Sequence, residues 1–177
     1  MAAARRPRQR DFWITNTEDL AALQQRLQQA GTGDVKRAMN ERIRRGARPV
    51  HRDLQQAMRT LPIRGKRRRR GARSYSGPSP TTRPLRATLA AAIRLSVTTG
   101  KGARIWVDKS RLAPDLKNMV RNTNDGHWRH PVFGDEHTWV DQYAKKGWWW
   151  DTIRPHMPRL RADMERILND VERRLGG

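Results

Sequence analysis

The sequence predicts an α+β protein, because it combines helical and strand-like patterns in separate segments. Apolar residues recur every three or four positions near both ends of the chain, as in amphipathic helices, whereas the middle alternates between apolar and polar residues, as in strands. A length of 177 residues suits one domain. We therefore expect a disordered basic arm over residues 1–12 and a single α+β domain over residues 13–177.

Two N-terminal helices are expected. The first begins at Thr15, which forms a capping-box pattern with Glu18 ahead of a run of apolar residues ending at Ala30. The second begins at Asp34, and Pro49 predicts a kink or a split in it near residues 46–49. Its apolar stripe consists of Val35, Met39, Ile43, Val50, Leu54 and Met58. Its other face is basic, with Lys36, Arg37, Arg42, Arg44, Arg45, Arg48 and Arg52.

Residues 62–84 predict a flexible basic loop, because like charges combined with Gly and Pro oppose a compact local fold. The cationic residues of its basic run are Arg64, Lys66, Arg67, Arg68, Arg69, Arg70 and Arg73. They are candidates for contact with DNA phosphates, which carry no base information, or with an acidic protein. No aromatic residue lies within the run, so base stacking is not indicated.

The middle of the chain predicts a helix over 85–93 and then an antiparallel hairpin near 93–108 that turns at 100–102. Residues 114–120 form a short helix at most, and a short strand of the same small sheet is expected near 130–133. A turn follows this strand, with His130, Pro131 and Gly134 as its structural residues. We expect a positive φ at Gly134, where a Cβ would be penalised.

The last segment predicts a long amphipathic helix that starts near Pro158, since proline is tolerated in the first turn. Its apolar stripe consists of Ile153, Met157, Leu160, Met164, Ile167, Val171 and Leu175. We expect this stripe to be buried against the sheet or against a neighbouring helix.

The charge of the chain is strongly positive and uneven. The net charge is +21, and residues 1–86 hold 22 Lys and Arg against 6 Asp and Glu, compared with 16 against 11 in residues 87–177. A chain this basic favours polyanions or acidic proteins as partners. It has no Cys for a disulfide or thiol chemistry, and no apolar run long enough for a membrane span or a secretory signal. We therefore expect no membrane partner.

The segment from 127 to 152 gathers five of the seven Trp. Large aromatic rings are enriched at protein interfaces, so Trp139, Trp148, Trp149 and Trp150 are candidates for a subunit interface. The last three are consecutive, and their side chains must diverge. We expect at least one of them to leave the local core and to be buried by a partner subunit, since exposed adjacent rings favour aggregation.

The same segment is rich in histidine, and a metal site at His127, His130 and His137 is one interpretation. No Cys or HExxH pattern supports it, so we prefer hydrogen-bonded structural histidines beside Trp. The nearby carboxylates, Asp135, Glu136, Asp141 and Asp151, come with no recognisable nucleophile or phosphate-binding loop. We expect no metal, no cofactor and no enzymatic activity.

A set of motifs in the second half carries a family resemblance. The order is a hairpin, an H-P-V-F-G turn at 130–134, W-V-x-Q at 139–142, G-W-W at 147–149 and a final amphipathic helix. In this order the chain resembles the tail-completion or neck proteins of long-tailed bacteriophages, a minor-tail-component family, most of all the actinobacterial phage and prophage branch. The likeness covers roughly residues 15–175, and the basic run at 64–73 is not a hallmark of that family.

The resemblance implies a non-enzymatic structural virion protein of the head–tail junction, assembled in the host cytoplasm. It implies a homo-oligomeric ring, six- or twelve-fold, that surrounds the DNA passage and touches a head-closure protein, a tail terminator or the tail tube. The alternative is a free-standing basic nucleic-acid-binding protein, and a third reading is an enzyme with a His/Asp site.

Overall fold

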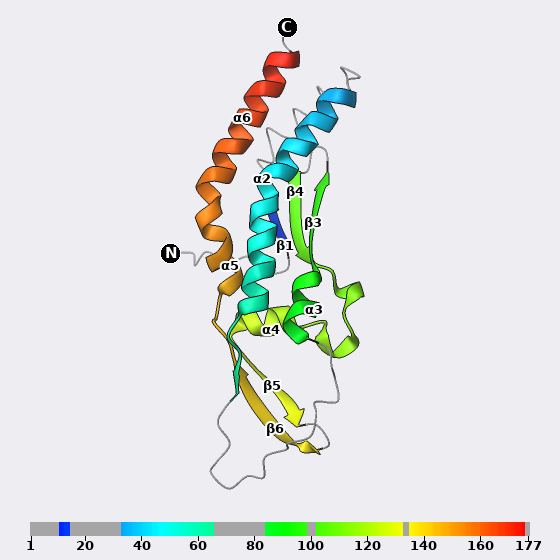
Figure 1. Cartoon of the computed structure of the whole chain (residues 1–177), viewed down its shortest axis with the longest axis vertical. Coiled ribbons are helices and arrows are strands. Elements are labelled where there is room, and N and C mark those ends of the chain that lie inside the picture. Colours follow the sequence, from blue (N-terminus) through cyan, green and yellow to red (C-terminus); the bar gives the residue numbers. More distant parts are fainter. Residues whose placement is uncertain (1–10, 15–32, 66–83, 99–101, 133–134, 176–177) are drawn as a thin grey trace, which may run out of the picture.

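The computed structural model describes residues 11–14, 33–65, 84–98, 102–132 and 135–175. Its fold is α+β, as the sequence predicts, and helix α2 (Gly33–Thr60) is the central element (Figure 1). One antiparallel sheet packs along α2, the long C-terminal helix α6 (Met157–Leu175) runs antiparallel beside it, and a second sheet lies at the opposite end of the molecule from the C-terminus. No described helix is both long and apolar enough to cross a membrane.

Helix α2 is one continuous helix, so of the two forms expected near residues 46–49, a kink or a split, the split is wrong and the kink stays a prediction. Pro49 lacks an N–H and removes one backbone hydrogen bond from the helix interior. Its neighbours Ala47 and Val50 are fully buried, and this packing holds the backbone helical across the proline. The predicted apolar stripe forms the core of α2, in which Met39, Ile43, Val50, Leu54 and Met58 are buried.

The first sheet has the strand order β1-β4-β3. Strands β3 (Ile93–Thr98) and β4 (Gly102–Val107) form the predicted hairpin. Strand β1 (Asp11–Ile14) pairs with β4 and includes Asp11 and Phe12, which we expected in the disordered arm. The Phe-Trp-Ile run favours a strand but is too short to be recognised without its partner. Residues 1–10 and the helix expected from Thr15 lie outside the described residues.

Helix α3 (Leu85–Ala91) leads into the first sheet, close to its predicted position. Strand β3 begins at Ile93. The carbonyl oxygen of Ile93 accepts a hydrogen bond from the side-chain amide of Gln55 at 3.2 Å and lies 2.8 Å from Nε2 of His51. These contacts fix the start of the first sheet against α2.

The second sheet has the order β2-β6-β5 and corrects the expectation of a single sheet. Strand β5 (His127–Val132) contains the predicted strand as far as residue 132 but pairs with β6 (Asp135–Tyr143), not with the hairpin. Strand β2 (Arg64–Gly65) pairs with the last residues of β6, so the start of the expected flexible loop is part of a sheet. Residues 66–83 of that loop lie outside the described residues.

Short helices connect the two sheets. They are the 3-10 turns η1 (Lys109–Arg111) and η2 (Pro114–Leu116) and the helix α4 (Met119–Asp125). After β6 the chain forms α5 (Trp148–Ile153), the 3-10 turn η3 (Arg154–His156) and then α6. Helix α6 begins one residue before Pro158, and its buried residues Leu160, Met164 and Ile167 lie in the common core. Helix α6 packs on α2, so the expected burial of its apolar stripe is against a neighbouring helix.

Candidate functional site: the exposed face of the second sheet

The second sheet is tied to the rest of the molecule at both ends of its hairpin. Helix α4 ends at Gly126, whose φ of +89° is a left-handed cap and whose carbonyl accepts the N–H of Ala144 at 3.0 Å. The N–H of Gly147 donates to the Asn124 carbonyl at 2.8 Å. The start of β5 and the segment after β6 are therefore both fixed to α4, which sets the orientation of the sheet.

Strand pairing places six side chains on one face of this sheet, because directly opposed residues of antiparallel strands share a face. His127 and Arg64 both pair with Tyr143, and Arg129 pairs with Asp141. Trp139 shares the face because side chains two apart along a strand point the same way. We call this surface the aromatic face: Arg64, His127, Arg129, Trp139, Asp141 and Tyr143.

The aromatic face is exposed. Trp139 keeps 50% of its surface accessible and Tyr143 keeps 43%, and they are the exposed large hydrophobic residues of the described chain. The opposite face holds the buried Trp128 together with the half-buried Val140 and Gln142. The sheet therefore has one covered side and one side that presents large rings to solvent.

Contacts within the aromatic face hold its side chains in place. The guanidinium of Arg129 lies 5.8 Å from the centre of the Trp139 ring, and its Nε lies 3.6 Å from Oδ1 of Asp141. Nε2 of His127 lies 2.9 Å from the same carboxylate oxygen, and its ring centre is 4.9 Å from that of Tyr143. Side chains already ordered in the free protein lose less entropy when a partner binds.

The chemistry of this face suits a macromolecular contact. Trp, Tyr and Arg are the residue types most enriched among those that dominate binding energy at protein interfaces. Arg64 starts the basic run, so the run begins in strand β2, opposite Tyr143. The remaining cations of the run, which are Lys66, Arg67, Arg68, Arg69, Arg70 and Arg73, lie outside the described residues.

Two of the tryptophans expected at an interface belong to the core, which corrects that expectation. Trp148 is 2% exposed and Trp149 is 4% exposed, with their rings 5.6 Å apart and nearly edge to face. Trp150 is half-buried against the same core. The consecutive rings do diverge, but α2 and α4 pack around α5 closely enough to bury two of them within one chain.

Two buried polar residues of α4 accept hydrogen bonds from Trp148 and Trp149. Nε1 of Trp148 donates to the Thr123 hydroxyl at 3.4 Å, and the backbone N–H of Trp149 donates to Oδ1 of Asn124 at 3.0 Å. Thr123 and Asn124 are the buried polar residues of the described chain. Their role became visible only with the structure, because the sequence shows no pattern that links them to tryptophans 25 residues away.

The expected turn residues are only partly described. The side-chain amide of Gln142 lies 2.8 Å from Nε2 of His130, in keeping with a hydrogen-bonded structural histidine. Pro131 lies in β5 opposite Trp139, next to an irregularity in the pairing. Because β5 is an edge strand, the missing N–H of a proline is tolerated there. Gly134 lies outside the described residues, so its φ stays a prediction.

His127 and His130 do not face a common site. Positions 127 and 130 are three apart in one strand, so His127 and His130 face opposite sides of the sheet. No group of three or more His, Asp or Glu side chains in the described part of the chain is arranged to hold a metal ion.

Four residues of the aromatic face were not predicted as interface residues from the sequence: His127 and Arg129 in β5, and Asp141 and Tyr143 in β6. No periodicity marks these residues, because the run from Trp139 to Tyr143 does not alternate between apolar and polar residues. Comparisons with protein-family models, curated proteins and solved structures found no match for this chain.

Proposed function

We propose that this protein is a structural component of a bacteriophage head–tail junction, a neck or tail-completion protein that assembles into a ring through its aromatic face. The observation that carries the assembly role is the pair of exposed rings, Trp139 and Tyr143, held by Arg129 and His127 on a fixed sheet. The phage setting rests on the motif order from 130 to 149 described above.

The size of these side chains is consistent with an interface anchor. Burying an aromatic side chain removes on the order of 150–250 Å² from water, and a standard interface covers roughly 800 Å² on each partner. Two rings together with the flanking arginines would provide a substantial part of such a patch. Because each ring is about half exposed, a partner can remove about half of that area from water, which at about 25 cal/mol per Å² contributes roughly 2–3 kcal/mol per ring before association costs.

In this proposal the protein is non-enzymatic and needs no metal or cofactor. The ring is six- or twelve-fold and surrounds the DNA passage between a head-closure protein and the tail terminator or tail tube. The basic run from Arg64 to Arg73, whose first residue belongs to the aromatic face, contacts DNA or an acidic neighbouring subunit.

Mass spectrometry of purified virions of the phage that encodes this chain tests the proposal. We expect the chain to co-purify with intact tailed particles at several copies per particle. A gene deletion complemented by the variant Trp139→Ala should give particles that lack the chain, whereas complementation by the wild type should restore it. Absence of the wild-type chain from infectious particles would refute the virion role and would favour the alternative, a free-standing nucleic-acid-binding protein.

A further inference from the structure

The outward face of α2 carries a second charged surface, distinct from the aromatic face. We call it the α2 arginine row: Arg37, Arg44, Arg45, Arg48 and Arg52, all of which are exposed. Arg44, Arg48 and Arg52 are spaced four residues apart, so their side chains project from the same side of the helix.

In the described part of the chain, only part of this row has an ion-pair partner: Arg37 pairs with Asp34 at 2.5 Å, and Glu41 lies on the same face of the helix. Among the described residues, no carboxylate lies within ion-pair distance of Arg44, Arg45 or Arg48. Arg52 has only a loose contact with its neighbour Asp53, at 3.4 Å, with 79% of the arginine side chain exposed. The centre of the row therefore presents guanidinium groups directly to solvent.

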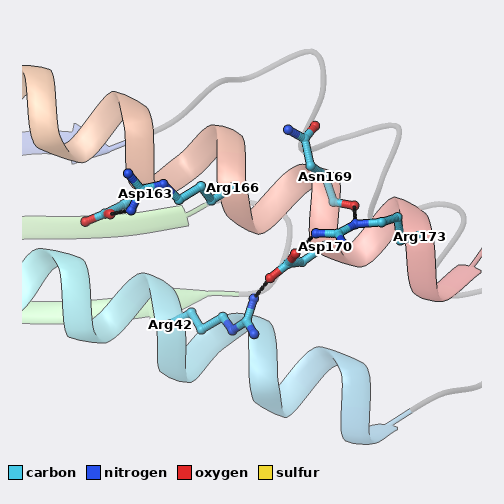
Figure 2. A network of polar contacts seen from close by, with 6 residues as sticks. All are labelled: Arg42, Asp163, Arg166, Asn169, Asp170 and Arg173. Carbon is cyan, nitrogen blue, oxygen red and sulfur yellow. Dashed lines mark hydrogen bonds and ion pairs between the residues drawn. The ribbon is translucent and has the colours of Figure 1, made fainter.

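The adjacent helix shows the opposite arrangement (Figure 2). Arg42 reaches from α2 to Asp170 of α6, and Arg173 binds the same carboxylate. Asp163 lies 3.7 Å from Arg166 and 3.8 Å from Arg159. The arginines of α6 that flank α2 are thus neutralised by carboxylates on their own helix, whereas the α2 arginine row is left positive.

The stability of α2 does not explain the row. Like charges four residues apart on a helix, such as Arg44, Arg48 and Arg52, repel each other, whereas Arg37 near the N-terminus is compensated by Asp34. A surface that is unfavourable for the isolated helix points to an anion supplied from outside the chain.

The composition of the surface indicates which anion fits. A groove of about 270 Å³ between α2 and α6 borders the row at Arg45, and its lining is charged apart from Gly46 and Ile167. It has no aromatic ring on which a single-stranded base could stack, and no apolar pocket of the kind that anchors a protein partner. These features favour a phosphate backbone whose bases remain paired.

The spacing of the row is also compatible with a duplex. At a rise of about 1.5 Å per residue, the row from Arg37 to Arg52 is roughly 22 Å long. A duplex presents one phosphate per strand for about every 3.4 Å of its axis, so a row of this length can reach several phosphates. Arginine forks bind phosphate in a bidentate manner. We propose that the α2 arginine row binds the backbone of double-stranded DNA without reading its sequence, independently of whether the aromatic face forms a ring.

The test measures binding of the full chain to a fluorescent 30-base-pair duplex at several salt concentrations. The row variant is Arg44→Ala/Arg48→Ala/Arg52→Ala. The control variant, Arg111→Ala/Arg121→Ala/Arg161→Ala, removes the same charge from exposed arginines elsewhere. Each lost phosphate contact should lower the slope of log affinity against log salt by about 0.9, so the row variant should lose roughly 2–3 from the slope.

The affinity at low salt should fall at least about tenfold for the row variant and only a few-fold for the control. Equal losses in the two variants would overturn the proposal, because binding would then follow net charge or the basic run at 64–73. Binding to polyglutamate that depends on the row, without binding to the duplex, would overturn it in favour of an acidic protein. The oligomeric mass of the row variant should equal that of the wild type, so failure here is distinguishable from failure of the aromatic face.

Discussion

Two groups of aromatic residues on either side of one short segment have opposite surroundings. Trp148 and Trp149 are closed into the core at the junction of α2, α4 and α5, whereas Trp139 and Tyr143 lie on the open face of the second sheet. Only residues 144–147 separate the two groups, so the same stretch of chain supplies both a core and an exposed surface.

The difference lies in what each group contacts. The core rings have polar partners for both the indole N–H of Trp148 and the backbone N–H of Trp149, and apolar residues surround them. The exposed rings contact Arg129 and His127, which are themselves exposed. Rings of the first kind stabilise the fold, and rings of the second kind are available for a partner. Substitutions in each group should therefore affect different measurements.

The largest loss of stability is expected for Trp148→Ala. Removing a large buried ring leaves a cavity and should lower the free energy of unfolding by roughly 3–5 kcal/mol. Urea denaturation followed by circular dichroism measures this loss, with Trp148→Phe expected to lose less. A loss below about 1 kcal/mol for Trp148→Ala would show that the ring is not part of the core.

The next largest loss of stability is expected at Gly126, which packs against Lys146 in the segment between the two groups. At Gly126 a Cβ would approach Cβ of Lys146 to 2.8 Å, and the φ of +89° is unfavourable for any side chain. Gly126→Ala should cost roughly 1–3 kcal/mol. The control is Gly46→Ala, where the nearest atom is 3.7 Å away in a helix interior and a gain of roughly 0.5–1 kcal/mol is expected. Equal melting temperatures for the two variants would contradict the close contact with Lys146 and the positive φ at Gly126.

A smaller, pH-dependent effect is expected where the segment after β6 meets α5. Nζ of Lys145 lies 2.7 Å from Asp151, and this hydrogen bond, with the lysine charge, lowers the pKa of the Asp151 carboxyl below its ordinary value of 3.8. A carboxyl with a lowered pKa in the folded state contributes stability above its unfolded pKa, and this is lost as the pH falls through the folded value.

The variant Asp151→Asn should therefore be slightly less stable than the wild type at pH 7, and the two melting temperatures should converge as the pH falls below 3.8. Thermal melts across the pH range measure the difference. A difference that stays constant down to pH 2 would mean that the ion pair contributes nothing to stability.

The helices and the hairpin were predictable because their signals are local. The stripe from Met39 to Met58 and the stripe from Leu160 to Ile167 follow the helical period directly. The split at Pro49 was mispredicted because the packing of Ala47 and Val50 overrides a local penalty. Strand β1 depends on pairing with β4, which is about 90 residues away along the chain and leaves no local pattern.

The candidate site was predictable only in part. Trp139 stood out as a large ring, but the consecutive rings at 148–150 stood out even more, and two of these three proved to be core. Which ring is buried depends on whether α4 supplies Thr123 and Asn124 at the right place, and this is a property of the tertiary fold. Arg64 lies on the aromatic face because strand β2 pairs with β6, and a strand of two residues is too short to show a periodic pattern in the sequence.

The smallest effect on stability is expected on the aromatic face itself. The double variant Trp139→Ala/Tyr143→Ala removes two exposed rings, so its free energy of unfolding as a monomer should stay within roughly 1 kcal/mol of the wild type. Chemical denaturation at low protein concentration measures this. A loss comparable with that of Trp148→Ala would mean that the exposed rings support the fold and that the two groups do not differ.

The mass of the assembled protein, measured by sedimentation, tests the assembly role of the aromatic face most directly. The wild type should form a ring-sized oligomer, and the Trp139→Ala/Tyr143→Ala variant should sediment as a folded monomer. The control Trp106→Ala removes a half-buried ring that also lies beside an arginine, Arg104, at 5.2 Å but on the first sheet, and it should assemble normally. A wild type that stays monomeric, or a double variant that assembles as well as the wild type, would contradict this role.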